Sequence, residues 1–158
     1  MKTILSSALL VTLFACQTTV ESQNAASTQA TKNNNNMTFS PKLQQYADSL
    51  TLEFDQISEE RKLALAQLAN FVQKELSDSS LPVKLTFICT HNSRRSHMGQ
   101  IWAATAAAYY QISGIESYSG GTEATAFNPR AVAAMQRAGF GIENPGGDNP
   151  RYVVHLTD

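Results

Sequence analysis

Hydrophobic residues recur at helical spacing in two segments of the first half of the chain. The first segment begins at Ser40-Pro41, a pair that suits the N-cap and the first position of a helix. The second segment begins at Ser58. Its apolar face consists of Leu65, Leu68, Val72 and Leu76. Two amphipathic helices joined by a short turn are typical of a helical hairpin. We therefore predict a helical hairpin over residues 40–80 that packs on the rest of the protein.

Shorter apolar runs, separated by turn residues, follow Leu81-Pro82 and predict an α/β domain over residues 81–158. Three runs have the length and composition of strands: residues 85–89, 115–119 and 152–156. Two segments between them have helical spacing: residues 96–109 and 128–139. Asn128 suits an N-cap and Gly139 suits a helix end. The pattern predicts a partial parallel sheet with helices packed on it.

The first 16 residues have the features of an export signal. Lys2 supplies a positive charge, residues 4–15 form an apolar stretch, and Leu13-Phe-Ala-Cys16 resembles a bacterial lipoprotein cleavage box, with Cys16 as the lipidated residue. Residues 17–39 are polar and rich in Asn, Gln, Thr and Ser, which predicts a disordered linker. This reading predicts a periplasmic or membrane-anchored lipoprotein, whereas translation from Met37 would give a cytoplasmic protein.

Charge and histidine spacing limit the partners that the sequence predicts. The formal net charge is -1 and no run of basic residues occurs, which argues against a nucleic-acid partner. The three histidines, His91, His97 and His155, lack the spacing of metal ligands. We predict no metal or cofactor, and we expect His97 on the surface of its helix.

The candidate chemistry lies between the first strand and the next helix, where the chain reads Cys89-Thr-His-Asn-Ser-Arg-Arg-Ser96. A tight loop entering a helix turns backbone N–H groups inward, and the first helical turn adds unpaired donors, so such a loop binds phosphate-like anions. The same field favours the thiolate of Cys89. Arg95 can hold two oxyanion oxygens with its planar guanidinium, and Ser96 can donate to the sulfur. The loop therefore predicts a thiolate nucleophile in an anion site.

Two motifs resemble the low-molecular-weight protein tyrosine phosphatase superfamily, which includes arsenate reductases. Residues 89–98 are similar to the phosphate-binding loop of that family, and residues 118–135 are similar to its Ser-Ala-Gly-Thr segment followed by Asn-Pro and a helix. The resemblance covers residues 83–142, about the first half of the family's catalytic domain. It implies the phosphatase type of fold, which has four parallel strands.

Carried over by position, the resemblance implies that the catalytic set is Cys89, Arg95 and Ser96. The implied substrate-binding residues are Thr90, His91, Asn92, Ser93, Arg94 and Arg95. The His91-Asn92 pair is closer to arsenate reductases that use an external thiol. Arg94 stands where thioredoxin-linked arsenate reductases have a second cysteine, so we expect no internal cysteine relay.

The family's general acid, an Asp followed by Pro, has no counterpart in residues 1–158. We therefore expect the sequence to be truncated at its C-terminal end. The leading hypothesis is a phosphomonoester hydrolase that forms a cysteinyl-phosphate and acts on a phosphorylated protein. The alternatives are an arsenate reductase that uses an external thiol carrier on a small oxyanion, and a truncated, non-catalytic oxyanion-binding protein.

Overall fold

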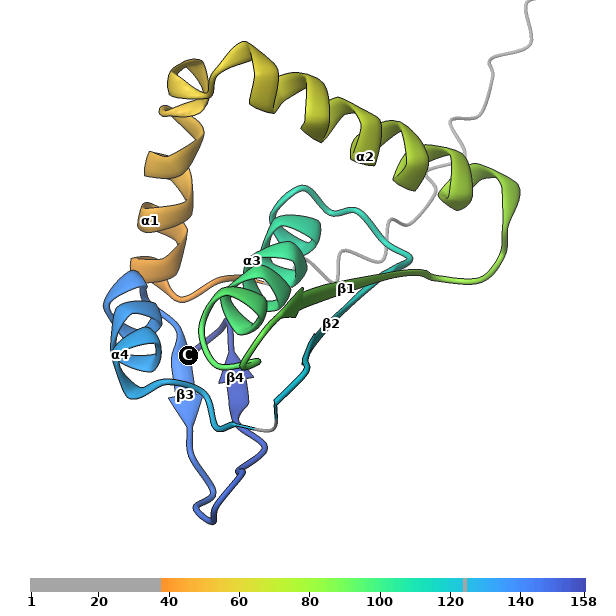
Figure 1. Ribbon diagram of the computed structural model, residues 1–158. Helices are drawn as coiled ribbons and strands as arrows, with labels where there is room; N and C mark the ends of the chain where they lie inside the picture. Colours follow the sequence, from red (N-terminus) through yellow and green to blue (C-terminus); the bar gives the residue numbers. More distant parts are fainter. Residues whose placement is uncertain (1–37, 124) are drawn as a thin grey trace, which may run out of the picture. The chain divides into compact units, whose positions relative to one another are not determined.

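The computed structural model describes residues 38–123 and 125–158 (Figure 1). The predicted signal segment, its lipidation site Cys16 and nearly all of the predicted linker 17–39 lie outside the described residues. A search of the described part for a helix long and apolar enough to cross a membrane finds none.

Helix α1, Pro41–Thr51, begins where the sequence predicts. The Ser40 hydroxyl accepts a hydrogen bond from the Leu43 backbone N–H at 3.3 Å and donates to the Gly139 carbonyl at 2.9 Å. Leu43 and Ala47 are buried and form the inner face of the helix. The N-cap residue therefore both starts α1 and joins it to a segment about a hundred positions away in the chain.

Helix α2, Glu59–Asp78, follows α1 through the short 3-10 helix η1, Phe54–Gln56. The predicted second helix is present, and its packing in a hairpin stays a prediction. Helices α1 and α2 diverge in Figure 1, and α2 has no buried residue. Leu65 and Leu68, on its predicted apolar face, remain 50% and 45% exposed. Leu43 of α1 lies in the same core as the buried residues of α4.

Strands β1, Val83–Cys89, and β2, Ile115–Gly121, form a parallel pair in which Val83 lies opposite Ile115 and Cys89 opposite Gly121. Helix α3, Arg95–Tyr109, packs on one face of this pair. The contact is close, because a Cβ atom on Gly99 of α3 would lie 2.6 Å from the Phe87 ring. The opposite face is open, and Ile88 is 73% exposed. The predicted strand over residues 85–89 is therefore present within β1 and is covered on one face only.

Helix α4, Pro129–Ala138, has Asn128 as its N-cap and ends at Gly139 in a left-handed conformation, as predicted. Two short antiparallel strands follow, β3, Gly141–Glu143, and β4, Val153–His155. The strand predicted over residues 152–156 is therefore present, but it pairs with β3 and not with the parallel sheet. Strand β3 was not predicted, because three residues are too few to show a period.

The main core lies between α1, α3, α4 and the β3–β4 pair. Its buried members are Phe39, Leu43, Phe127, Ala131, Met135, Ala138 and Phe140. Aromatic edges contribute to the packing: the Trp102 ring of α3 meets the Phe140 ring at 5.1 Å between centroids. The fold is α/β with a two-stranded parallel sheet, which is a smaller sheet than the four strands implied by the resemblance.

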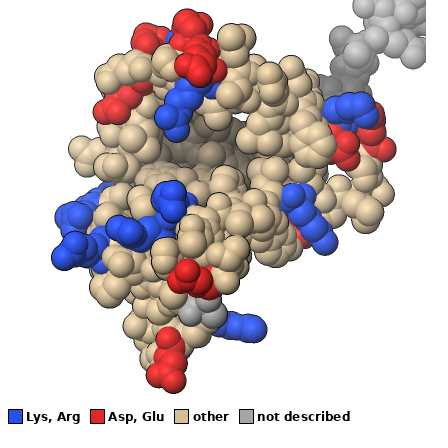
Figure 2. Space-filling view, in the orientation of Figure 1, with Lys and Arg blue, Asp and Glu red and all other residues tan. Residues whose placement is uncertain are grey.

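Charges of both signs occupy the face shown in Figure 2. Acidic side chains gather over η1 and the start of α2, where Asp55, Glu59 and Glu60 occupy first-turn positions. Lys and Arg side chains gather beside α4. This face therefore has a mixed field.

Candidate active site

The loop of interest leaves the carboxyl end of β1 and enters the N-terminus of α3. Cys89 is the last residue of β1 and is partly buried, and Arg95 is the first residue of α3. Asn92 has a φ of 43°, a left-handed conformation that Asn adopts more readily than most residues. The left-handed residue turns the chain sharply between strand and helix, as an anion-binding loop requires.

A hydrogen-bonded row links the sulfur to the loop. Cys89 Sγ and Ser96 Oγ lie 3.1 Å apart, and Ser96 Oγ lies 2.8 Å from Asn92 Oδ1. Ser96 has a single hydroxyl hydrogen, and a thiolate has none to donate. The one hydrogen cannot serve both bonds, so donation from the Ser96 hydroxyl to an ionised Cys89 takes the place of its donation to Asn92 Oδ1. Because Ser96 is only 2% exposed, water does not compete strongly for this bond.

These bonds favour the thiolate. The Ser96 hydroxyl is the largest cause that lowers the pKa of Cys89 from 9.0 to about 6, followed by the Ser96 backbone N–H. Desolvation opposes the shift, while the backbone N–H groups of Ser93 and Asn92 support it. At pH 7 a thiol with this pKa is about nine-tenths ionised. The loop therefore presents a reactive sulfur nucleophile at neutral pH.

A pocket of about 240 Å³ opens beside the sulfur. Its lining residues are Cys89, His91, Ser93, Arg94, Arg95, Thr125 and Asn128. Both arginines are exposed, and neither forms an ion pair with another residue of the described part. Two unpaired guanidinium groups beside a thiolate suit a small, multiply charged oxyanion.

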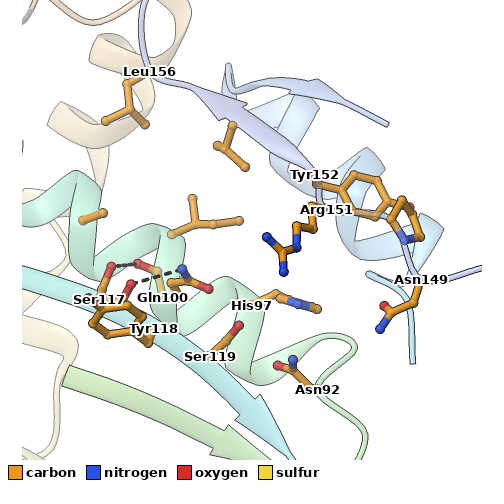
Figure 3. Close-up of a pocket in the computed structure, with 14 residues that line it drawn as sticks. Asn92, His97, Gln100, Ser117, Tyr118, Ser119, Asn149, Arg151, Tyr152 and Leu156 are labelled. Carbon is orange, nitrogen blue, oxygen red and sulfur yellow. Dashed lines mark hydrogen bonds between the residues drawn. The ribbon is translucent and has the colours of Figure 1, made fainter. Parts of the chain in front are cut away.

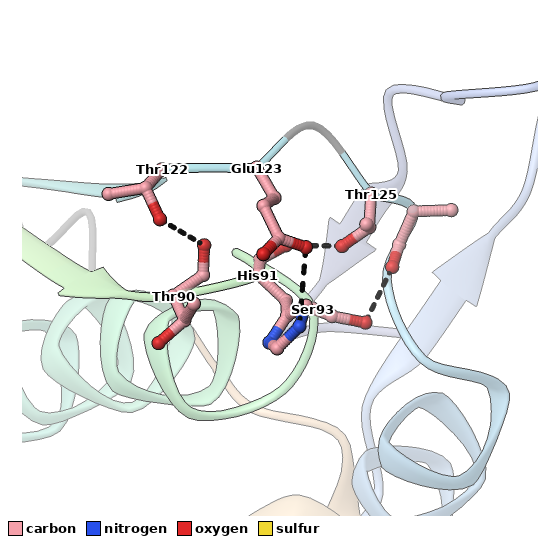
Figure 4. A network of polar contacts seen from close by, with 7 residues as sticks. Thr90, His91, Ser93, Thr122, Glu123 and Thr125 are labelled. Atoms are coloured by element: carbon pink, nitrogen blue, oxygen red, sulfur yellow. Dashed lines mark hydrogen bonds and ion pairs between the residues drawn. The ribbon is translucent and has the colours of Figure 1, made fainter.

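The segment after β2 closes the other side of the loop (Figure 4). The Thr90 carbonyl accepts hydrogen bonds from the backbone N–H groups of Thr122 and Glu123, at 2.9 and 3.0 Å. Ser93 is held from the same segment, because its hydroxyl donates to the Ala126 carbonyl at 2.8 Å. Strand β2 must approach closely, since a Cβ on Gly121 would lie 2.6 Å from the Asn92 nitrogen. These contacts fix the loop from outside its own sequence.

The structure places the predicted residues in three groups. Cys89, His91, Ser93, Arg94 and Arg95 line the pocket. Ser96 and Asn92 lie behind the sulfur, in hydrogen-bond contact with it and with each other. Thr90 and Asn92, predicted to bind substrate, do not line the pocket: the Thr90 carbonyl joins the loop to the β2 segment instead.

Three residues near the pocket were not predicted as site residues: Glu123, Thr125 and Asn128. Thr125 and Asn128 line the pocket, and Glu123 pairs with His91. A signal was available, because the carboxyl ends of two parallel strands meet at one edge of a sheet. The residues just after β2 could therefore have been placed near the residues just after β1. In the described part of the chain, no group of three or more His, Cys, Asp or Glu residues could hold a metal ion.

A second, larger cavity of about 1130 Å³ lies between α3, β2 and the segment before β4 (Figure 3). His97 and Arg151 point toward it from opposite walls. Contrary to expectation, His97 is not a surface residue: its ring lies 4.7 Å from the Phe127 ring, and Nδ1 is buried. Burial lowers the pKa of His97, and the nearby Ser93 backbone opposes this shift only in part. His97 Nδ1 has no hydrogen-bond partner of good geometry in the described part of the chain.

The α/β scaffold and the loop together have the form of a thiol-based oxyanion site. The chain is 45% identical over 75 residues to arsenate reductase 2 of Staphylococcus epidermidis, which covers 46% of this chain and 53% of the relative. It is 42% identical over 62 residues to an arsenate reductase of Bacillus subtilis, 39% of this chain and 42% of the relative. An arsenate reductase of Staphylococcus aureus is 40% identical over 62 residues, with 39% and 44% covered.

The chain thus spans about half the length of the curated relatives that it matches. No protein-family model and no solved structure matches it. These partial matches make the chain similar to part of the arsenate reductases named above.

Proposed function

We propose that this chain supplies the nucleophilic half of an arsenate reductase, with Cys89 attacking arsenate in the pocket. The observation that carries the proposal is the Cys89 thiolate, with a pKa of about 6, beside the unpaired Arg94 and Arg95. The names of the relatives favour arsenate over other oxyanions. Arsenate is small enough for a pocket of about 240 Å³.

The proposed reaction has two steps. The Cys89 thiolate attacks arsenic, an As–S bond forms, and one oxygen leaves as water after it gains a proton. A thiol from an external carrier then attacks the Cys89 sulfur, and a mixed disulfide forms. The electron pair of the As–S bond departs with arsenic, so As(V) becomes As(III) and leaves as arsenite, while two thiols are oxidised to one disulfide.

An external thiol is part of the proposal because of the surroundings of Cys89. It is the one free cysteine in the described part of the chain. Arg94, at the position where the resemblance places a second cysteine in thioredoxin-linked reductases, lines the pocket instead. The pocket is open at the side of His91, which is 57% exposed, so a carrier thiol has access to the sulfur.

Phosphomonoester hydrolysis is the second candidate, and Arg94 favours it. A second guanidinium at the pocket suits a dianionic phosphate, and the same attack by Cys89 would form a cysteinyl-phosphate that water hydrolyses. Arsenate and phosphate monoesters share tetrahedral geometry and charge, so one loop is suited to both.

The test is a pair of assays on the purified full chain. One measures arsenite formation from arsenate with a thiol carrier, and the other measures hydrolysis of p-nitrophenyl phosphate. We expect arsenite formation that requires the carrier and that Cys89→Ser abolishes. Cys16→Ser is the matched control and should leave the rate unchanged.

The outcomes separate the candidate functions. Hydrolysis without arsenite formation supports the phosphatase. If arsenate protects Cys89 from alkylation but no product forms, the chain is an oxyanion-binding protein. Turnover that persists in Cys89→Ser overturns both enzymatic proposals.

A further inference from the structure

His91 and Glu123 form an ion pair at the rim of the anion pocket (Figure 4). His91 Nε2 lies 3.2 Å from Glu123 Oε2, and the two side chains are 57% and 54% exposed. His91 lines the pocket together with Cys89, whereas Glu123 does not line it. The imidazole therefore stands between the carboxylate and the space that a substrate would fill.

The pair is held by backbone contacts on both sides. The Thr125 hydroxyl donates to the His91 carbonyl, and the Glu123 backbone N–H donates to the neighbouring Thr90 carbonyl at 3.0 Å. These bonds join the loop after β1 to the segment after β2. The backbones of His91 and Glu123 are therefore held near each other by bonds other than the contact between their side chains. Such support from neighbouring bonds is what a preorganised catalytic group needs.

Among the described residues that line the pocket, His91 is the candidate proton donor. Attack by Cys89 expels an oxygen that needs a proton. The residues that line the pocket include no Asp or Glu, and Arg94 and Arg95 do not lose protons at working pH. His91 is the one imidazole among them, and Glu123 Oε2 lies 3.2 Å from its Nε2.

We propose that His91 is the general acid of this site and that Glu123 is the residue that positions it. The proposal rests on the function proposed above. With arsenate, the Cys89 thiolate, HAsO₄²⁻ and the imidazolium give the cysteinyl-arsenate dianion, water and neutral imidazole. With a phosphate monoester, the same groups give the cysteinyl-phosphate dianion, the free alcohol and neutral imidazole. Charge and protons balance in both.

The experiment uses leaving groups that differ in their need for a proton. On the full chain, His91→Gln should lower kcat/KM for phenyl phosphate and for carrier-dependent arsenate reduction by about 10²-fold or more, the usual contribution of general acid catalysis. For 2,4-dinitrophenyl phosphate, whose leaving group departs unprotonated, the loss should stay below about threefold. Imidazole in the buffer should restore turnover of phenyl phosphate by His91→Gly.

The matched control is His155→Gln. His155 forms the same kind of pair, with its Nε2 3.1 Å from Glu143 Oε1, but it lies on β4 and does not line the pocket. Both substrates should be turned over at the normal rate by this variant. Glu123→Gln tests the positioning role. Turnover of phenyl phosphate should fall while turnover of 2,4-dinitrophenyl phosphate stays within about threefold, because a misplaced imidazole matters only where the leaving group needs a proton.

Equal losses on the two aryl phosphates, or no loss on either, would overturn the role of His91 while the proposed function stands. Equal losses of Glu123→Gln on the two aryl phosphates, or no loss on either, would overturn the role of Glu123. If the unmodified chain shows no Cys89-dependent turnover of any of these substrates, the proposed function fails, and the role of His91 fails with it.

Discussion

Replacing Ser96 with alanine tests the central claim about the sulfur. The Ser96 hydroxyl lies 3.1 Å from Cys89 Sγ and is the largest cause of the low pKa of Cys89. Alanine removes this donor and leaves the backbone N–H groups of Ser96, Ser93 and Asn92 in place. The side chain is 2% exposed, so the loss also leaves the Asn92 amide without its partner.

The expected change in the pKa of Cys89 follows from how many groups lower it. The pKa of Cys89 falls from 9.0 to about 6 through four hydrogen bonds, which desolvation partly opposes. Loss of the largest contribution should raise the pKa by roughly one to two units. At pH 7 the thiolate fraction would then fall from about nine-tenths to between about one-half and one-tenth.

The assay is the rate of Cys89 alkylation by iodoacetamide as a function of pH, in a Cys16→Ser background. The midpoint should move from about 6 to about 7–8 in Ser96→Ala, while the rates converge at high pH because both proteins are then fully ionised. Ser93→Ala is the control, since its hydroxyl donates to the Ala126 carbonyl and not to the sulfur. A midpoint that stays near 6 in a folded Ser96→Ala protein would refute the assigned cause.

Two further predictions concern stability, measured by urea unfolding with the fluorescence of the single tryptophan. Gly99→Ala should destabilise the protein by about 1–2 kcal/mol, because the added Cβ would lie 2.6 Å from the Phe87 ring. The gain in helix propensity offsets only part of this strain. Adding Phe87→Leu should recover part of the lost stability. Ser40→Ala should cost about 1–2 kcal/mol, since it removes both the α1 cap and the bond to the Gly139 carbonyl. Ser49→Ala, which removes only an exposed hydroxyl on α1, is the comparison, and an equal loss there would contradict the reasoning about Ser40.

Local signals predicted most elements, because their causes lie within a few residues. Ser40-Pro41 and Asn128-Pro129 mark helix starts, and Gly139 marks a helix end, through bonds and dihedral angles that nearby residues determine. The order strand, loop, helix around Cys89 was predictable for the same reason. An apolar period shows which face of a helix is apolar, but it does not say what covers that face. Helix α2 illustrates this limit, since its apolar positions recur at helical spacing and yet it has no buried residue.

For the site, the sequence by itself determined the nucleophile loop, because Cys89, Asn92, Arg95 and Ser96 are close in the chain and the entry to a helix dictates which of their groups converge. Only the tertiary structure decided what closes the pocket. The parallel pairing of β1 and β2 brings Glu123 beside His91, more than thirty positions away. Such contacts depend on strand register and on the close approach at Gly121, which no local pattern encodes. The conformation of the loop around Cys89 is local, whereas the pairing of His91 with Glu123 depends on the fold.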